Sequence, residues 1–594
     1  MKGQVALADA KSSQASDADS QATFEKMAAE EAKSADARTA SDLADNSLEA
    51  PSETSKAADS LPEGADGEEA GSEEEDVDEE ETQAQPGATA STSSKKKKKP
   101  KKKKKKAADG SADSSTSAVS SQQPIQPTQV HDIQSLLKQL ALSQQQPKRE
   151  GKAPEDYKFW NTQPVPKFRE PNLLQTTDGA NGESLPEGPI LPDKVCRASA
   201  KAEPEKLVDG FEWCLVDLDD KEELHELYDL LDNHYVEDTD GSFRFRYSEQ
   251  FLSWALKPPG WRKDWHIGVR TKGSEDGKKG KLVAFIAGIP VTLRVGAEQK
   301  FNATEINFLT IHRKLRGKRL APVLIKEVTR RCYLNDIYQA LYTAGTLLPT
   351  PISTCRYFHR SLDWEHLYKT GFSHIPSGTT ELRQKYKYRM DPNTKLKGLR
   401  PMKREDIPAV KDLLTRYLER FHLRQEWTTE EIDHWICSEA SKGVVSSFVV
   451  EKDGGGISDF VSYYLLESTV LRSNSRGRDT IRAAYLYYYA TESAFPIPNT
   501  PKPKARDLQE TLAQRLRELM HDALVLAKKD DYHVFNALTL LDNPLFLKEE
   551  KFEPGDGKLN YYLFNWRTES LGGGVDGRNE IDTSRMGGVG IVML

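Results

Sequence analysis

The chain has 594 residues and a formal net charge of −8, from 84 lysines and arginines against 92 aspartates and glutamates. The length suits two or three domains, and the charge is an average over very unlike segments, so it selects no class of partner. Five scattered cysteines without CxxC spacing argue against a disulfide framework or a zinc site and favour a reducing compartment. No apolar run could span a membrane and no signal-peptide pattern opens the chain, so we expect a soluble, cytoplasmic protein.

Residues 1–150 are predicted to be a disordered tail, because polar and small residues dominate and aromatic residues are nearly absent. The tail contains an acidic block, Glu73–Glu81, and a lysine run, Lys95–Lys106, interrupted only by Pro100. Such a run attracts polyanions, so we expect contact with the ribosome or RNA; a nuclear address and an inert solubilising tail are the alternatives. Apolar residues at helical spacing after Ile133 indicate a short docking helix.

A short aromatic motif opens the folded region near Tyr157. Phe159 and Trp160 are the first large aromatic residues after the polar tract, and Pro164 and Pro166 then force an extended path. A pair of this kind most often packs on a core, and it can also stack on a flat ligand.

Two stretches of the chain repeat one order of elements. Residues 211–237 and 399–421 each combine a short strand with an amphipathic helix. Strands and a further helix follow, at 266–270, 282–290, 305–312 and 322–335 in the first stretch and at 446–451, 460–466, 481–489 and 508–529 in the second. The repetition predicts a duplicated α/β unit with halves at 151–394 and 395–594, and a proline- and lysine-rich loop insertion at 495–506 in the second.

The stretch Glu305–Lys326 is predicted to be a strand, a basic turn and the start of a helix. Five cations follow the strand within seven positions: Arg313, Lys314, Arg316, Lys318 and Arg319. Pro322 marks the helix start, where its missing N–H is harmless. A helix N-terminus behind basic residues favours phosphate binding, although the turn lacks the Gly-rich Walker pattern and has only Gly317 for a close backbone approach. The alternative is a solvated basic loop.

Several motifs together resemble the glycylpeptide N-tetradecanoyltransferase (N-myristoyltransferase) family. They are KFWNTQPVP, HYVEDTDGSFRF, FLSWALKPPGW, EINFLTIHRKLRGKRLAPVLIKEVTRR, LYTAG, STCRYFHRSLDW, DALVLAKKDDYHVFNAL and GDGKLNYYLFNW, in order from about Tyr157 to Leu594. The resemblance implies an α/β fold of two pseudo-symmetric halves, each similar to the GNAT acyltransferase fold. The halves would form one saddle-shaped mixed β-sheet flanked by helices, the first binding acyl-CoA and the second supplying the peptide groove and catalytic terminus.

The resemblance also implies transfer of a myristoyl group from myristoyl-CoA, a co-substrate, to the N-terminal glycine amine of proteins. Neither a permanently bound cofactor nor a metal is expected. The matching acyl-CoA positions are Lys158, Phe159, Trp160, Phe308, Leu309, Thr310, Ile311, Arg316, Gly317, Lys318, Arg319, Leu320 and Ala321. Phe308 and Leu309 would donate backbone N–H groups to the thioester oxygen. Thr310 and Gly317 stand where the family usually has Cys and Ser. This difference removes a side-chain contribution to phosphate binding, but the backbone N–H donors remain.

Positions that match the family's peptide-binding residues are Tyr235, Asn307, Thr343, Gly345, His359, Ser462, Tyr485 and Asp556. Asp556 and the acidic loop Glu237–Asp240 would favour basic residues further along the substrate. For each of these residues the alternative is a packed or merely solvated side chain. His312, beside the strand, is expected to be a packed or hydrogen-bonded residue rather than a base.

The family's base is the C-terminal α-carboxylate, which Leu594 would carry here. The chain ends GGVGIVML, an apolar sequence with glycines that suits a buried tail, although a terminal strand without chemistry is the alternative. A monomeric enzyme with ordered binding, acyl-CoA first, and direct attack by the amine is expected. The other hypotheses are a short-chain N-acetyltransferase of the same fold and a ribosome- or RNA-associated factor that uses the fold only as a platform.

Overall fold

A computed structural model describes residues 153–168, 187–238, 241–273, 278–297, 299–471, 479–497 and 501–594 of the protein. The predicted tail at 1–150, its lysine run and the helix near Ile133 lie outside the described residues. No helix of the described part is long and apolar enough to cross a membrane.

The described elements comprise α-helices, with short 3-10 turns between them, and β-strands. The helices are α3 (Lys158–Asn161), α4 (Asp193–Ser199), α5 (Lys221–His234), α6 (Glu249–Leu256), α7 (Leu320–Leu334), α8 (Trp364–Lys369), α9 (Glu381–Lys387), α10 (Ile407–Leu418), α11 (Thr429–Ile432) and α12 (Ala505–Lys529). The strands of the first predicted half are β1 (Phe211–Leu215), β2 (Phe243–Arg246), β3 (His266–Thr271), β4 (Leu282–Val295), β5 (Gln299–Ile311), β6 (Ala340–Ala344) and β7 (Ser353–Ser361). Those of the second are β8 (Leu399–Pro401), β9 (Leu423–Gln425), β10 (Val445–Glu451), β11 (Ile457–Val470), β12 (Thr480–Thr491), β13 (Val534–Leu538), β14 (Glu553–Phe564) and β15 (Val589–Gly590).

One mixed sheet runs through the described chain in the order β1-β3-β4-β5-β6-β14-β7-β13-β12-β11-β10-β8. On this path β5–β6 and β12–β13 are the parallel neighbours. A parallel pair needs a crossover connection, and α7 and α12 supply the two crossovers. The same order of elements therefore occurs twice, as the sequence repetition predicts.

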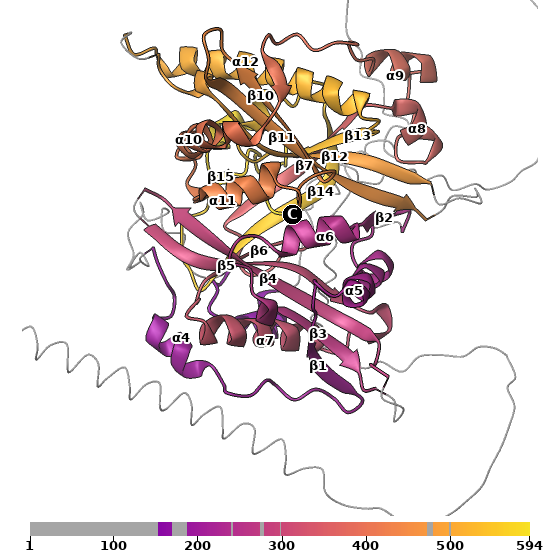
Figure 1. Cartoon of the computed structure of the whole chain (residues 1–594), viewed down its shortest axis with the longest axis vertical. Helices are drawn as coiled ribbons and strands as arrows, with labels where there is room; N and C mark the ends of the chain where they lie inside the picture. Colours follow the sequence, from indigo (N-terminus) through magenta and orange to yellow (C-terminus); the bar gives the residue numbers. More distant parts are fainter. Residues whose placement is uncertain are drawn as a thin grey trace, which may run out of the picture. The chain divides into compact units, whose positions relative to one another are not determined.

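The two halves exchange their last strands. The strand after β6 in sequence is β7, which pairs with β13, whereas β14, which follows β13, lies between β6 and β7. Figure 1 shows the early elements and the late elements on either side of these central strands. The sheet thus continues across the predicted boundary at 394/395, which stays a prediction.

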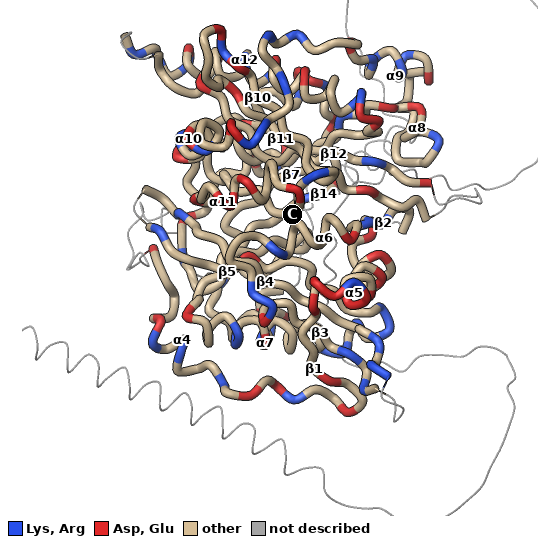
Figure 2. The backbone as a smooth tube through the Cα atoms, viewed as in Figure 1, with Lys and Arg blue, Asp and Glu red and all other residues tan. Residues whose placement is uncertain are grey.

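Amphipathic helices cover the sheet, as the spacing of their apolar residues predicts. Leu227 and Leu231 of α5 and Val410 and Leu414 of α10 are all fully buried. The Asp220 side chain accepts hydrogen bonds from the first-turn N–H groups of α5 and so fixes where that helix begins. Figure 2 shows basic and acidic residues interleaved over the backbone of both halves, with an acidic run on α5.

Several predicted bounds differ from the structure. The helix after the basic turn begins at Leu320, so Pro322 is its third residue, where a backbone N–H still has no partner within the helix. The predicted strand at 282–290 continues to Val295, because it pairs with β5 and β9 beyond Pro290. The insertion predicted as a loop at 495–506 gives way to α12 at Ala505.

Candidate active site

A β-bulge interrupts the hairpin of β4 and β5. Ile286 of β4 stands opposite two residues of β5, Phe308 and Leu309, which the pairing register skips. Phe308 has a φ of 58°, in the left-handed region that a phenylalanine rarely adopts. Its buried ring packs against Tyr235 and Tyr247, with centroids 5.9 and 5.3 Å away. The surrounding aromatic rings therefore hold a strained backbone in place.

An apolar pocket opens where β5 parts from β6. The two strands pair only over Thr304–Ile306, whereas β6 pairs with β14 over its whole length. The pocket contains about 740 Å³ of non-atom space, part of it open to solvent. Its walls come from β4, β5, β6, β14, α3 and α7, and include Ile306, Leu309, Ile325, Val328, Cys332 and Phe564. Walls of this apolar character suit a hydrocarbon chain.

Stacked aromatic rings form one wall of the pocket. Trp160 lies nearly parallel to Tyr342 at 5.5 Å, and Tyr342 lies on Tyr562 at 5.0 Å. The structure thus places Trp160 at the pocket, and Phe159 is buried against it, whereas Lys158 is exposed. The aromatic motif of the sequence is both packed and pocket-facing.

The basic turn lies between the bulge and α7. Gly317 has a φ of 72° and Arg319, the residue before the helix, has a φ of 58°. Added atoms at Gly317 would meet no neighbour within the protein, so its φ is what favours glycine there, and a close approach to a ligand stays a prediction. Lys318 and Arg319 are exposed beside the start of α7, where unpaired N–H groups and the helix dipole favour anions.

The pKa values of two histidines near this turn are lowered by burial and by the surrounding cations. The pKa of His234 falls to about 4, first through burial and then through the neighbouring His312 and the cations Arg313, Lys281 and Arg316. The pKa of His312 is also lowered, first by burial and then by the cations Lys281, Lys314 and Arg316. His312 Nδ1 accepts the Lys314 N–H at 3.2 Å, so it is a hydrogen-bonded turn residue.

The C-terminal tail is buried in the molecule. Ile591, Val592, Met593 and Leu594 are 0, 7, 4 and 9 % exposed, and the chain end lies near the middle of the view in Figure 1. The segment Val589–Gly590 pairs with β9. A side chain at Gly590 would come within 2.6 Å of Phe421, so only glycine fits this crossing.

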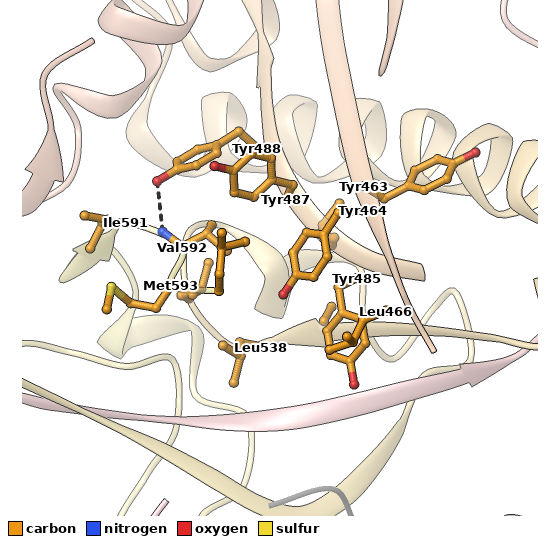
Figure 3. Close-up of a cluster of buried hydrophobic side chains, with 14 of the residues drawn as sticks. Tyr463, Tyr464, Leu466, Tyr485, Tyr487, Tyr488, Leu538, Ile591, Val592 and Met593 are labelled. Carbon is orange, nitrogen blue, oxygen red and sulfur yellow. Dashed lines mark hydrogen bonds between the residues drawn. The ribbon is translucent and has the colours of Figure 1, made fainter. Parts of the chain in front are cut away.

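Tyrosine hydroxyl groups hold the tail. Val592 N–H donates to Tyr488 Oη at 3.0 Å, and Figure 3 shows this bond among the aromatic residues of β11 and β12. Tyr561 Oη donates to the carbonyl oxygen of Ile591 at 3.2 Å. These contacts help to hold the last residues in the protein interior.

A second bulge lies on β12 at the place that matches the first. Ser462 of β11 stands opposite Tyr487 and Tyr488. Its Oγ accepts the Tyr488 N–H at 3.2 Å and donates to the Tyr488 carbonyl oxygen at 2.8 Å. The serine hydroxyl group therefore provides hydrogen-bond partners for the backbone of the bulge. Ile286, the matching residue of the first half, has no polar side-chain atom that could do this.

Some predicted peptide-binding residues gather near the first bulge. Tyr235 touches Phe308, Asn307 precedes it, and Thr343 lines the pocket. The carbonyl oxygen of Gly345, next in the chain after β6, accepts from the Asn560 side chain at 3.3 Å. Tyr485 stacks on Tyr464 at 5.3 Å, further along the aromatic cluster.

His359 and Asp556 form a second group on β7 and β14. His359 Nδ1 is 2.6 Å from Asn536 Oδ1, and burial lowers the pKa of His359 to about 4 against a smaller opposing effect of Asp556. Asp556 is exposed, and the Glu237 side chain of the acidic loop already pairs with Arg244 and Arg313. The peptide-binding roles of all these residues stay predictions.

Groups that could hold a metal ion, meaning three or more His, Cys, Asp or Glu side chains, do not occur among the described residues. All five cysteines are free thiols. Burial raises the pKa of Cys332, at the pocket wall, to about 12, so this thiol is not a nucleophile. The site therefore combines a β-bulge, an apolar pocket, a basic turn before a helix and a buried chain end.

Family models match both halves of the chain. Residues 191–355 match the N-terminal domain of myristoyl-CoA:protein N-myristoyltransferase, and residues 369–592 match its C-terminal domain. The chain belongs to the N-myristoyltransferase family. The predicted family, fold class and enzyme class are confirmed.

Curated relatives and solved structures agree with this membership. The glycylpeptide N-tetradecanoyltransferase of Emericella nidulans is 52% identical over 470 residues, which cover 78% of this chain and 88% of the relative. That of Schizosaccharomyces pombe is 46% identical over 78% of this chain and 95% of its own. A crystal structure of Saccharomyces cerevisiae N-myristoyltransferase with bound myristoyl-CoA has a TM-score of 0.68 at 46% identity, and the match covers 74% of this chain and 100% of that one.

The predicted acyl-CoA residues miss much of the pocket. Ile325, Thr329 and Tyr333 of α7 and Leu348 after β6 line it without belonging to the predicted set. The α7 sequence does contain a signal for these residues. Ile325 follows the buried Leu324 on a second apolar side of the helix and is only partly buried, which is typical of a residue that lines a pocket. Tyr488, which holds the tail, has no such local signal.

Proposed function

We propose that this N-myristoyltransferase transfers a myristoyl group from myristoyl-CoA to the N-terminal glycine amine of proteins. The observation that carries the proposal is the bulge at Phe308, which stands between an apolar pocket and a basic turn at a helix start. In this arrangement the pocket takes the acyl chain and the turn takes the CoA phosphates. The thioester carbonyl carbon then lies at the bulge.

The backbone N–H groups of Phe308 and Leu309 bind the thioester oxygen. The bulge takes both residues out of the ladder register with β4, and no hydroxyl group on Ile286 competes for them. When the amine attacks, negative charge develops on that oxygen, and fixed donors stabilise it by about 3 kcal/mol. Thr310 Oγ donates to the Phe308 carbonyl oxygen at 3.2 Å and helps to fix the bulge.

The α-carboxylate of Leu594 takes a proton from the glycine ammonium. The neutral amine then attacks the carbonyl carbon, the new C–N bond forms, and the C–S bond breaks as CoA leaves as its thiol. The burial of the tail supports this role, because an exposed terminus would be solvated and mobile. An amine with a pKa near 8 needs only a weak base held in a dry site.

The pocket favours this function over short-chain acetyl transfer. Each CH₂ group buried in it contributes about 0.8 kcal/mol, so a tetradecanoyl chain gains far more than an acetyl group. An acetyl group would also leave most of the apolar wall without a partner. The ribosome- or RNA-binding alternative rests on the lysine run, which lies outside the described residues.

The proposal is tested by mass analysis of peptide products. Myristoyl-CoA and acetyl-CoA are each incubated with a peptide that begins with glycine and with its alanine-initiated counterpart. We expect one added tetradecanoyl group on the glycine peptide with myristoyl-CoA, and at most traces in the other three reactions. Turnover of acetyl-CoA in preference to myristoyl-CoA would contradict the proposal, as would modification of an internal lysine in place of the terminal amine.

A further inference from the structure

Glu305 is a buried carboxyl group that the mechanism above does not use. It lies on β5 three residues before the bulge residue Phe308 and is 6 % exposed. Successive side chains of a strand point to opposite faces. Thr304 points to α7, where its Oγ is 3.3 Å from Cys332 Sγ. Glu305 and Asn307 therefore share the other face of β5, away from α7.

The contact between Glu305 and Asn307 fixes the direction of an amide. Asn307 Nδ2 donates to Glu305 Oε1 at 2.7 Å. An ionised carboxylate only accepts hydrogen bonds, so it holds the NH₂ end of the carboxamide and leaves the oxygen end facing away. Within the described residues no lysine, arginine or histidine forms an ion pair with Glu305. The negative charge of Glu305 therefore acts through the hydrogen bond that Asn307 donates to it.

We propose that Glu305 is a positioning residue of the glycine pocket, holding the Asn307 carboxamide with its oxygen toward the incoming amine. The proposal rests on the proposed function, which places the acyl carbonyl group at the neighbouring bulge. An ammonium or amine presents N–H donors, which an amide oxygen attracts and an amide NH₂ group would repel. Glu305 acts through Asn307 and does not itself touch the reacting atoms.

The groups that face Glu305 across the fold are the phenols of β12. Burial is the main reason why the pKa values of Tyr487 and Tyr488 are raised. The Tyr488 hydroxyl group adds to the effect on Tyr487, and the charge of Glu305 adds a smaller effect on both. The charge of Glu431 in α11 also raises the pKa of Tyr487, by less than Glu305 does. Tyr488 in turn accepts the Val592 N–H of the tail that ends in the Leu594 carboxylate. These phenols stay neutral at physiological pH, so they leave the Glu305 charge uncompensated.

The arrangement makes binding of the glycine end sensitive to pH. Burial raises the pKa of Glu305 to about 7, against a smaller lowering by the Asn307 hydrogen bond. Below that pH the group gains a proton and becomes a donor, which allows it to bond the oxygen of Asn307 and reverse the amide. Peptide affinity is then expected to fall as the pH decreases through about 7.

The test compares Glu305→Met, Glu305→Gln and the surface control Glu439→Gln, whose side chain is 87 % exposed. For each full-length protein the peptide KM, kcat and myristoyl-CoA affinity are measured on both sides of about pH 7. We expect Glu305→Met to raise the peptide KM about tenfold with myristoyl-CoA affinity unchanged. Glu305→Gln carries an NH₂ donor that does not titrate, so it should resemble the protonated glutamate, with a peptide KM that is raised at every pH and no longer depends on pH near 7.

Two results would overturn the proposal: a wild-type peptide KM in Glu305→Met, or a pH dependence near 7 that persists in Glu305→Gln. If Glu305→Met fails to fold, shown by lost myristoyl-CoA binding, the pH profile of the isosteric Gln variant still decides. Failure of the proposed function is distinguishable, because the wild-type protein itself would then give no myristoylated peptide.

Discussion

Two residues of β5 are held in states that oppose folding. Phe308 has a left-handed backbone, and Glu305 is a carboxyl group removed from water with a single hydrogen bond from Asn307. Strain of the first kind is on the order of 1–3 kcal/mol and persists only where the surroundings fix it. Both residues lie at the predicted acyl-transfer site. Such trade-offs of stability for activity are common at functional sites.

We expect replacement of Glu305 by a neutral residue to raise the free energy of unfolding, by an amount that depends on pH. Its folded pKa of about 7 lies above the ordinary 4.5, so the folded state binds more protons than the unfolded state between these values. The wild-type protein therefore loses stability as the pH rises through this window, and the loss is complete above about pH 7. The difference corresponds to on the order of 3 kcal/mol.

Denaturant unfolding of wild type and Glu305→Gln at several pH values measures this effect. We expect the variant to be the more stable protein above pH 7 and the difference to shrink toward pH 4.5. A variant that is less stable than wild type by the same amount at every pH would show that the charge of Glu305 stabilises the fold.

The two bulges lie at matching places in the two halves and differ in the residue opposite them. In the second half, Ser462 satisfies the N–H of Tyr488, and the Tyr488 hydroxyl holds the tail. In the first half, the matching positions are Ile286 and Leu309, and the apolar Ile286 side chain offers no hydrogen-bond acceptor to the bulge. The two bulges differ in the hydroxyl group opposite them and in the left-handed backbone of Phe308, which neither Tyr487 nor Tyr488 shares.

This comparison predicts that Ile286→Thr impairs catalysis where Ile286→Val does not. The two variants have nearly the same shape, but the threonine Oγ can accept the Leu309 N–H as Ser462 Oγ accepts that of Tyr488. Loss of one oxyanion donor lowers the rate of the chemical step by about 10²-fold. Single-turnover rates at saturating myristoyl-CoA provide the measurement, and equal rates for the two variants would rule out this role of the bulge.

Local signals allow the strand, basic turn and helix around Gly317 to be predicted, because periodicity, charge and proline placement all lie within one short stretch. The alternation of Glu305 and Asn307 with apolar neighbours predicts a strand, but not that its polar face is buried. Phe308 carries no sequence sign of a positive φ, since glycine or asparagine is the usual residue there. The family resemblance implies backbone donors at Phe308 and Leu309, but the sequence itself does not indicate the bulge.

At the scale of the whole molecule, the exchange of β7 and β14 joins the two halves into one sheet. Pairing between strands that are distant in sequence leaves no local pattern, so the duplication was predictable and the exchange was not. The same exchange places β14 beside β6 at the pocket, and Tyr561 of β14 holds the tail. Ribosome contact, cytoplasmic location and a monomeric state stay predictions, as does the disorder of the tail at 1–150.

The most direct test of the account is the rate of acyl transfer when only the terminal charge is removed. Wild type is compared with a protein that ends in a Leu594 carboxamide, which keeps the buried side chains, and with one that lacks Met593 and Leu594. Leu594→Met, which retains a carboxylate, is the control. We expect both altered termini to lower CoA release with myristoyl-CoA and a glycine peptide by at least about 10²-fold while myristoyl-CoA still binds. Full activity of the carboxamide form would contradict the account and place the base elsewhere.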